Sequence, residues 1–354
     1  MRIDEARALA ADWVRAQPGW PAPFVGAFFT GSTVDADPAA PLAATSDVDL
    51  AVVLDGEAPG KPGKLDHHGV LLEVTYLPWA DLADPAVVAR TFYLAPSFAR
   101  DTVVADPSGR LAALRGAVAP VFARPDVVRD RWGSVLARMT AAPAPADSWA
   151  VAVTRWLFPM SLGTAVVLVA ARANPTVRLR YLRAREALTA CGLADRYRPL
   201  LDELGCADVA PALVVAHLDA MAAAFDDAAA GPPAPFFFAA DLTPAARPVP
   251  VDGARDLVAA GDHREAVFWL VATFARCVQA LDAADAPAAA RHRDAFAAAV
   301  DDLLGLRGAD DLARRRAAVL AGLPALVATA EEVLAATPGR AAPDAALGRR
   351  REAL

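Results

Sequence analysis

Three acidic side chains in the first quarter of the chain have a spacing that suits metal binding. Asp47 and Asp49 are separated by one residue, and Glu73 lies in a later apolar stretch. In a β-strand, residues i and i+2 point to the same side, about 6.6 Å apart, so the two aspartates are expected to project together. Val48 and Leu50 are expected to enter the core from the opposite side. Pairing of the two strands would bring Glu73 to the aspartates.

Three carboxylates held this close repel one another and resist ionisation unless a cation neutralises them. Magnesium favours hard oxygen ligands. Two such ions about 3.5–4 Å apart can hold the attacking and leaving oxygens of an in-line displacement at phosphorus. Chemistry of this kind depends on positioning and charge neutralisation. Asp47, Asp49 and Glu73 are therefore the candidate metal ligands and catalytic residues, with two Mg²⁺ ions as the expected cofactors.

A Gly-Ser pair at the end of the preceding apolar run has the residue types of a phosphate-binding turn. Glycine lets a phosphate approach the backbone closely. Gly31 and Ser32 would supply backbone N–H groups and a hydroxyl to a triphosphate, and Ser46, next to Asp47, is placed in the same nucleotide-binding set. A Gly-Ser pair alone is more often a simple turn, so its weight comes from the acidic residues that follow.

The elements that must position these residues are predicted from apolar and β-branched runs. Strands are expected at 25–29, 48–54, 70–77 and 102–105, and helices at 3–16, 79–94 and 110–122. The segment 57–69 is expected to be a hairpin-type connection. From residue 125 onward, helical patterns dominate. The sequence thus predicts an α+β fold, with a small mixed-sheet domain at 1–125, a mostly helical domain at 126–336 and a tail at 337–354 that frays.

Composition narrows the function classes. The net charge is −7 and the pI is near 5.3, so binding to nucleic acid through the phosphate backbone is disfavoured. The three cysteines have no metal-ligand or disulfide spacing. The N-terminus lacks the apolar core of a signal peptide, and the apolar run at 156–171 is shorter than the ~20 residues of a membrane span. A cytoplasmic protein without a membrane partner is expected.

The run FFTGS…TSDVDLAVVL…LLEVTYL resembles the polymerase-β-like nucleotidyltransferase superfamily over about the first third of the chain. The resemblance implies that Gly31 and Ser32 contact a triphosphate, that Asp47 and Asp49 bind magnesium, and that Glu73 is the third acidic residue. The helical remainder is similar, more weakly, to the C-terminal domains of bacterial antibiotic nucleotidyltransferases of the kanamycin and streptomycin type. This similarity implies that the helical part is a substrate- or partner-binding domain.

One departure from the family pattern concerns the phosphate-binding cation. Fourteen residues separate Ser32 from Asp47, and no basic residue follows the Gly-Ser turn. Arg178, in a basic stretch of the helical part, is the candidate replacement, on one predicted helix face with Arg185. Lys61 and Lys64, the only lysines in the chain, are alternatives, although a solvated loop is the simpler interpretation of their segment.

The leading hypothesis is a magnesium-dependent enzyme that moves a nucleoside monophosphate, with AMP as first candidate, from ATP or another nucleoside triphosphate to a hydroxyl of a small molecule. An aminoglycoside-like antibiotic is one candidate acceptor. The alternative is a nucleotidyltransferase-fold antitoxin or regulator that binds or adenylylates a partner protein. A third interpretation is a non-catalytic nucleotide sensor. These hypotheses differ in whether Asp47 and Asp49 are needed for turnover.

Overall fold

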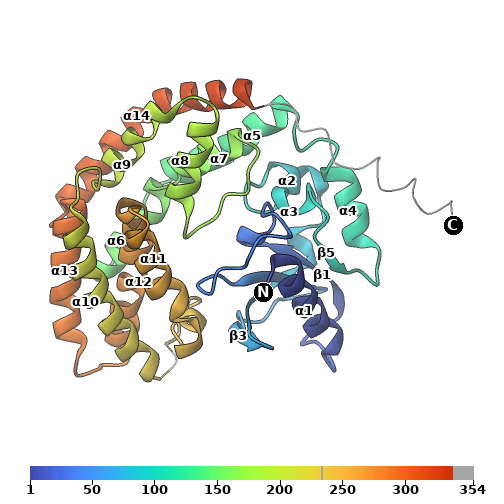
Figure 1. Ribbon diagram of the computed structural model, residues 1–354, viewed down its shortest axis with the longest axis horizontal. Coiled ribbons are helices and arrows are strands. Elements are labelled where there is room, and N and C mark those ends of the chain that lie inside the picture. The colour runs from blue at the N-terminus through green and yellow to red at the C-terminus, as the bar shows by residue number, and fades with distance from the viewer. Residues whose placement is uncertain (233, 338–354) are drawn as a thin grey trace.

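A five-stranded mixed sheet forms the N-terminal part of the fold (Figure 1). In the computed structural model, which describes residues 1–232 and 234–337, the strand order is β3-β4-β2-β1-β5. Strands β2 and β4 are parallel, and the other neighbours are antiparallel. The strands are β1 (Phe24–Thr30), β2 (Val48–Leu54), β3 (Gly63–His67), β4 (Val70–Pro78) and β5 (Val103–Ala105).

Four of these strands agree with the predicted ranges to within one or two residues. Strand β3 does not, because it lies in the segment expected to be only a connection. It carries polar residues at the edge of the sheet, so it lacks the apolar signal of a strand. A tight turn joins it to β4, with His68 and Gly69 both at positive φ (53° and 80°).

The predicted helix at 79–94 is too long. It is divided into a turn of 3₁₀ helix at Trp79–Asp81 and the helix α2 (Pro85–Arg90). Asp84 caps α2 by accepting a hydrogen bond of 2.8 Å from the Ala86 backbone N–H. Proline at the first position of a helix marks a new start rather than a continuation.

Helices cover both faces of the sheet, and side chains of β2 alternate between them. Helix α1 (Ile3–Ala16) packs on one face with Val48, Leu50 and Val52. Helices α2, α3 (Ala95–Phe98) and α4 (Arg110–Val118) pack on the other with Ala51 and Val53. The prediction that Val48 and Leu50 enter the core is confirmed, since both are fully buried. The aspartates must therefore face the other way.

The helical part curves round one side of the sheet, with its last helix along the outer edge (Figure 1). Its hydrophobic core is separate from the two cores of the sheet. Apart from Phe92, the residues of this core begin at Val128, directly after Val127 of a sheet core. Most of α12 is buried in this core. The longer helices are α5 (Pro125–Thr140), α6 (Trp149–Met160), α7 (Gly163–Ala170), α8 (Arg180–Ala190), α9 (Arg198–Leu204), α10 (Pro211–Ala230), α11 (Gly253–Ala259), α12 (His263–Ala283), α13 (Ala289–Leu304) and α14 (Ala309–Ala336).

The predicted boundary at residue 125 coincides with the first residue of α5. The predicted tail at 337–354 lies outside the described residues except for Thr337, which follows α14 directly.

Within residues 1–232 and 234–337, three helical stretches are long and apolar enough to cross a membrane by length and composition alone. They are Trp149–Ala170, His263–Ala283 and Ala289–Ala336, and 67%, 78% and 28% of their most apolar parts are buried within the fold. The first stretch joins α6 and α7 and begins before the apolar run at 156–171, so it is longer than that run. Every residue of α7 within the run is buried in the fold. Cytoplasmic localisation stays a prediction.

A buried arginine anchors the helical part to the sheet part. Arg131 of α5 donates hydrogen bonds to the carbonyl oxygens of Ala89 (2.9 Å) and Phe122 (3.1 Å). Its guanidinium also lies 4.3 Å from the centre of the Phe122 ring. Burial lowers the pKa of Arg131 to about 10. These bonds hold α5 against α2, and they set where the helical part stands relative to the sheet.

Replacing Arg131 by methionine is expected to lower the free energy of unfolding by about 2–4 kcal/mol, because two buried carbonyl groups lose their donor. Arg129→Met on the same helix is the matched control. Arg129 pairs with Glu331 at 2.7 Å, but both side chains are about half exposed, so its loss is expected to cost about 0–1 kcal/mol. Urea unfolding measures both. Equal losses in the two variants would contradict the anchoring role.

Candidate functional site

Four neighbouring strands each place one polar residue in a single row across the sheet. Thr30 of β1 lies opposite Asp49 of β2, Asp49 lies beside Glu73 of β4, and Glu73 lies opposite Lys64 of β3. Residues paired in this way point to the same face. The predicted pairing of the strands that carry Asp49 and Glu73 is therefore confirmed.

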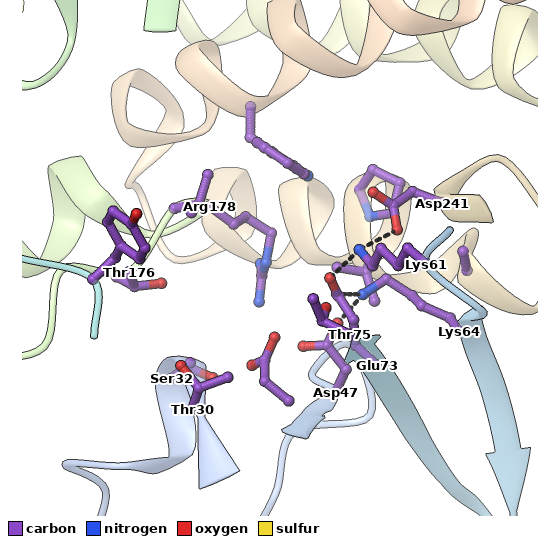
Figure 2. A pocket seen from close by; sticks show the side chains of 18 of the residues that line it. Thr30, Ser32, Asp47, Lys61, Lys64, Glu73, Thr75, Thr176, Arg178 and Asp241 are labelled. Atoms are coloured by element: carbon purple, nitrogen blue, oxygen red, sulfur yellow. Dashed lines mark hydrogen bonds and ion pairs between the residues drawn. The ribbon is translucent and has the colours of Figure 1, made fainter. Parts of the chain in front are cut away.

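Asp47, directly before β2, completes an acidic trio with Asp49 and Glu73. One carboxylate oxygen from each lies within 4.8 Å of the others. The side chains of Asp47 and Glu73 are only 14% and 21% exposed, so water screens their charges poorly. All three residues line one cavity, and Figure 2 shows Asp47 and Glu73 there. The structure thus brings together the three candidate metal ligands.

Two lysines neutralise part of the trio. The ammonium of Lys64 pairs with both Asp47 and Glu73, and that of Lys61 pairs with Glu73 and, at 3.0 Å, with Asp241 (Figure 2). Their side chains are only 6% and 18% exposed, so the interpretation of this segment as a solvated loop was wrong. The sequence did distinguish Lys61 and Lys64, because they are the only lysines in an arginine-rich chain.

The charge balance within the trio is uneven. Burial raises the pKa of Asp49 well above its usual value, and the charges of Asp47 and Glu73 raise it further. Burial also raises the pKa of Asp47. Burial would raise the pKa of Glu73 too, but Lys64 and Lys61 outweigh it and lower that pKa to about 2. Among the described residues Asp49 has no ion pair, so an added cation would favour its charged form most.

The Gly-Ser turn lies against the trio. Gly31 begins a 3₁₀ turn, Gly31–Thr33, directly after β1 and has a φ of +67°. A Cβ at this position would stand 1.7 Å from Oδ2 of Asp49, so only glycine allows this approach. The side-chain amide of Asn174, in the helical part, donates to the Gly31 carbonyl oxygen. Half-buried Ser32 lines the same cavity. Both predicted turn residues are therefore beside the carboxylates.

The long connection from Ser32 to Asp47 is held against the start of α1. The backbone N–H groups of Ile3 and Asp4 donate to the carbonyl oxygens of Ala40 (3.0 Å) and Pro38 (2.9 Å). Ser46, at the end of this connection, lines a neighbouring hollow rather than the cavity of the trio. Its placement in the nucleotide-binding set is not supported by its position.

Arg178 reaches the cavity, but not from a helix. It precedes α8, and its guanidinium donates to the Thr45 carbonyl oxygen at 3.4 Å. Burial lowers the pKa of Arg178, although Asp47 favours its charged form. The expected shared face with Arg185 is wrong, because α8 begins only at Arg180. Arg185 pairs instead with Asp262 at 2.8 Å.

The cavity lies between the sheet and the helical part and has a volume of about 400 Å³. Among the described residues, four carboxylates and four cationic side chains line it. Besides Arg178, the helical part contributes Asp241 and Arg276, which pair at 3.6 Å. Sequence patterns did not predict them, because each lies in a segment with no local motif and meets the trio only through the tertiary fold. The aromatic residues Phe225, Phe237 and Trp269 also line this side.

A comparison of the chain with models of protein families, with curated proteins and with solved structures finds no match. The resemblance to the polymerase-β-like superfamily accordingly rests on the residues themselves, from Gly31 to Glu73.

Replacing Lys64 by methionine is expected to make the stability of the chain depend more strongly on magnesium. Without metal, Asp47 loses its ion-pair partner and Glu73 keeps only Lys61. Removing one partner of a buried ion pair costs about 3–5 kcal/mol. Magnesium bound at the trio should restore much of that loss. Urea unfolding in EDTA and in excess Mg²⁺ measures the difference.

The control for this comparison is Arg183→Met, which removes an exposed pair with Glu186 (2.7 Å). The gain in its free energy of unfolding on adding magnesium should equal that of the unmodified chain. If Lys64→Met also gained no more from magnesium than the unmodified chain does, the lysine and the metal would not share the trio.

Proposed function

We propose that the protein is a magnesium-dependent nucleotidyltransferase. It moves a nucleoside monophosphate, with AMP as first candidate, from a nucleoside triphosphate to a hydroxyl of a small molecule and releases pyrophosphate. The observation that carries the proposal is the contact between two separate motifs. A glycine turn suited to phosphate touches Asp49, and Asp49 stands in the acidic trio at the floor of one cavity.

The donor set of the trio fits magnesium. It consists of three carboxylate oxygens close enough to share a cation, and magnesium prefers such hard ligands. The ammonium of Lys64, between Asp47 and Glu73, stands in for part of that positive charge. Asp47, Asp49 and Glu73 would hold the metal. When bound, magnesium ions neutralise phosphate charge and polarise the phosphorus centre.

The remaining residues of the cavity bind and orient the nucleotide in this proposal. The N–H groups of Gly31 and Ser32 and the Ser32 hydroxyl donate to the triphosphate. Arg178 supplies the cation that the Gly-Ser turn lacks, because its guanidinium lines the same cavity. These groups are already in place, so little reorganisation accompanies the reaction.

The reaction is a displacement at the α-phosphorus. The acceptor hydroxyl oxygen forms a bond to this phosphorus while the bond to the bridging oxygen of the β-phosphate breaks. The electron pair of the broken bond leaves with pyrophosphate, and a carboxylate of the trio accepts the hydroxyl proton. The chain supplies positioning and charge for this step and forms no covalent intermediate.

Asp49→Asn is expected to reduce nucleotidyl transfer about a thousandfold, since it removes a charge on which the metal site depends. Asp55→Asn is the matched control. Asp55 follows β2 directly, but it is exposed and pairs only with Arg110 at 3.1 Å among the described residues, so activity should be unchanged.

Incubation with labelled ATP, Mg²⁺ and a panel of hydroxyl-bearing small molecules measures both transfer and pyrophosphate release. Two results would count against the proposal. One is no transfer and no pyrophosphate release by the unmodified chain with any acceptor, and the other is full activity of Asp49→Asn.

A further inference from the structure

Part of the cavity wall is built by α10, α12 and the segment between α10 and α11. Phe225 of α10 and Trp269 of α12 line it, together with Phe237, Leu242 and Val249 from the segment between α10 and α11. We name this the helical half. Phe237 is 81% exposed, the largest exposed fraction among the large apolar side chains of the described residues. A solvent-facing phenylalanine at the edge of a cavity suits an apolar ligand surface.

The helical half offers no unpaired carboxylate among the described residues that line it. Its one acidic residue, Asp241, pairs with Lys61 at 3.0 Å and with Arg276 at 3.6 Å. Arg276 is also enclosed by aromatic rings, lying 5.0 Å from the centre of Trp269 and 5.4 Å from that of Phe238. Ammonium groups of a ligand would therefore meet cations and aromatic side chains that are already engaged.

The charges of the whole cavity also disfavour a ligand that carries several ammonium groups. Four cationic side chains match the four carboxylates. Two magnesium ions would in turn match the roughly four negative charges of a bound triphosphate. A loaded site is then close to neutral and holds no excess negative charge for a polycation.

The direction of attack decides which half takes the acceptor. In an in-line displacement, the attacking oxygen stands opposite the leaving group. If pyrophosphate leaves at the Gly-Ser turn, the acceptor must stand on the far side of the trio. In Figure 2, Ser32 and Asp241 lie on opposite sides of Asp47 and Glu73. The far side is therefore the helical half.

We propose that the helical half binds the acceptor, and that the acceptor is an uncharged amphipathic molecule with a hydroxyl group on an apolar body. This inference rests on the proposed nucleotidyl transfer, whose acceptor it specifies. It replaces the aminoglycoside-like candidate, because a polycation needs free carboxylates. The apolar body packs against Phe237 and Trp269, and the hydroxyl points to the trio.

Equilibrium dialysis of the full chain with Mg²⁺ and α,β-methylene ATP, which cannot undergo the transfer, tests this proposal. The probes are octyl glucoside, below the concentration at which it forms micelles, and the polycation kanamycin. One octyl glucoside should bind per chain, and kanamycin should not displace it. Phe237→Ser should weaken glucoside binding about tenfold or more. The matched control is Val215→Ser, also an exposed apolar residue (41%) but outside the cavity, and it should bind the glucoside unchanged.

Displacement of the glucoside by kanamycin would overturn the proposal, as would equal effects of Phe237→Ser and Val215→Ser. Weaker nucleotide binding in Phe237→Ser with unchanged glucoside binding would also overturn it, because the helical half would then hold the base. Binding of labelled α,β-methylene ATP is measured separately. Its absence contradicts nucleotidyl transfer itself, while the glucoside result still decides what the helical half accepts.

Discussion

The mutual repulsion of three half-buried carboxylates is the constraint on which the rest of the site depends. The register of β2 against β4 places Asp49 beside Glu73, and Asp47 is carried to the same face by the pleat of the chain. Charges this close need cations nearby. Lys64 and Lys61 supply some, and the second partner of Lys61, Asp241, links the trio to the helical part. Lys61 thus connects the carboxylates of the sheet to a carboxylate of the helical part.

The sites that could be predicted from sequence are those set by local rules. Alternation along β2 was enough to place Val48 and Leu50 in the core and to turn Asp47 and Asp49 to the opposite side. The glycine turn followed from its position after an apolar strand. No local rule indicated that β3 is a strand, because its polar residues resemble those of a loop.

The remaining contacts of the site depend on tertiary structure. The sequence pattern predicts Arg178 on one helix face with Arg185, but α8 begins after Arg178. The Arg178 guanidinium donates to the Thr45 carbonyl oxygen, whereas that of Arg185 pairs with Asp262. Asp241 and Arg276 approach the trio only because the helical part curves back to the sheet (Figure 1). Arg131 fixes that approach through two backbone carbonyl groups that no sequence pattern identifies. The choice of ligand depends on these cavity walls, which form only in the tertiary fold.

The central claim is that the acidic trio holds magnesium beneath a nucleotide bound at the Gly31 turn. A crystal structure of the chain with Mg²⁺ and α,β-methylene ATP tests it most directly. The account predicts metal ions coordinated by Asp47, Asp49 and Glu73, phosphate oxygens at the N–H groups of Gly31 and Ser32, and the Lys64 ammonium moved away from its position between Asp47 and Glu73. Lys64 still bridging those two carboxylates, with no ion at the trio and the nucleotide absent or bound elsewhere, would contradict it.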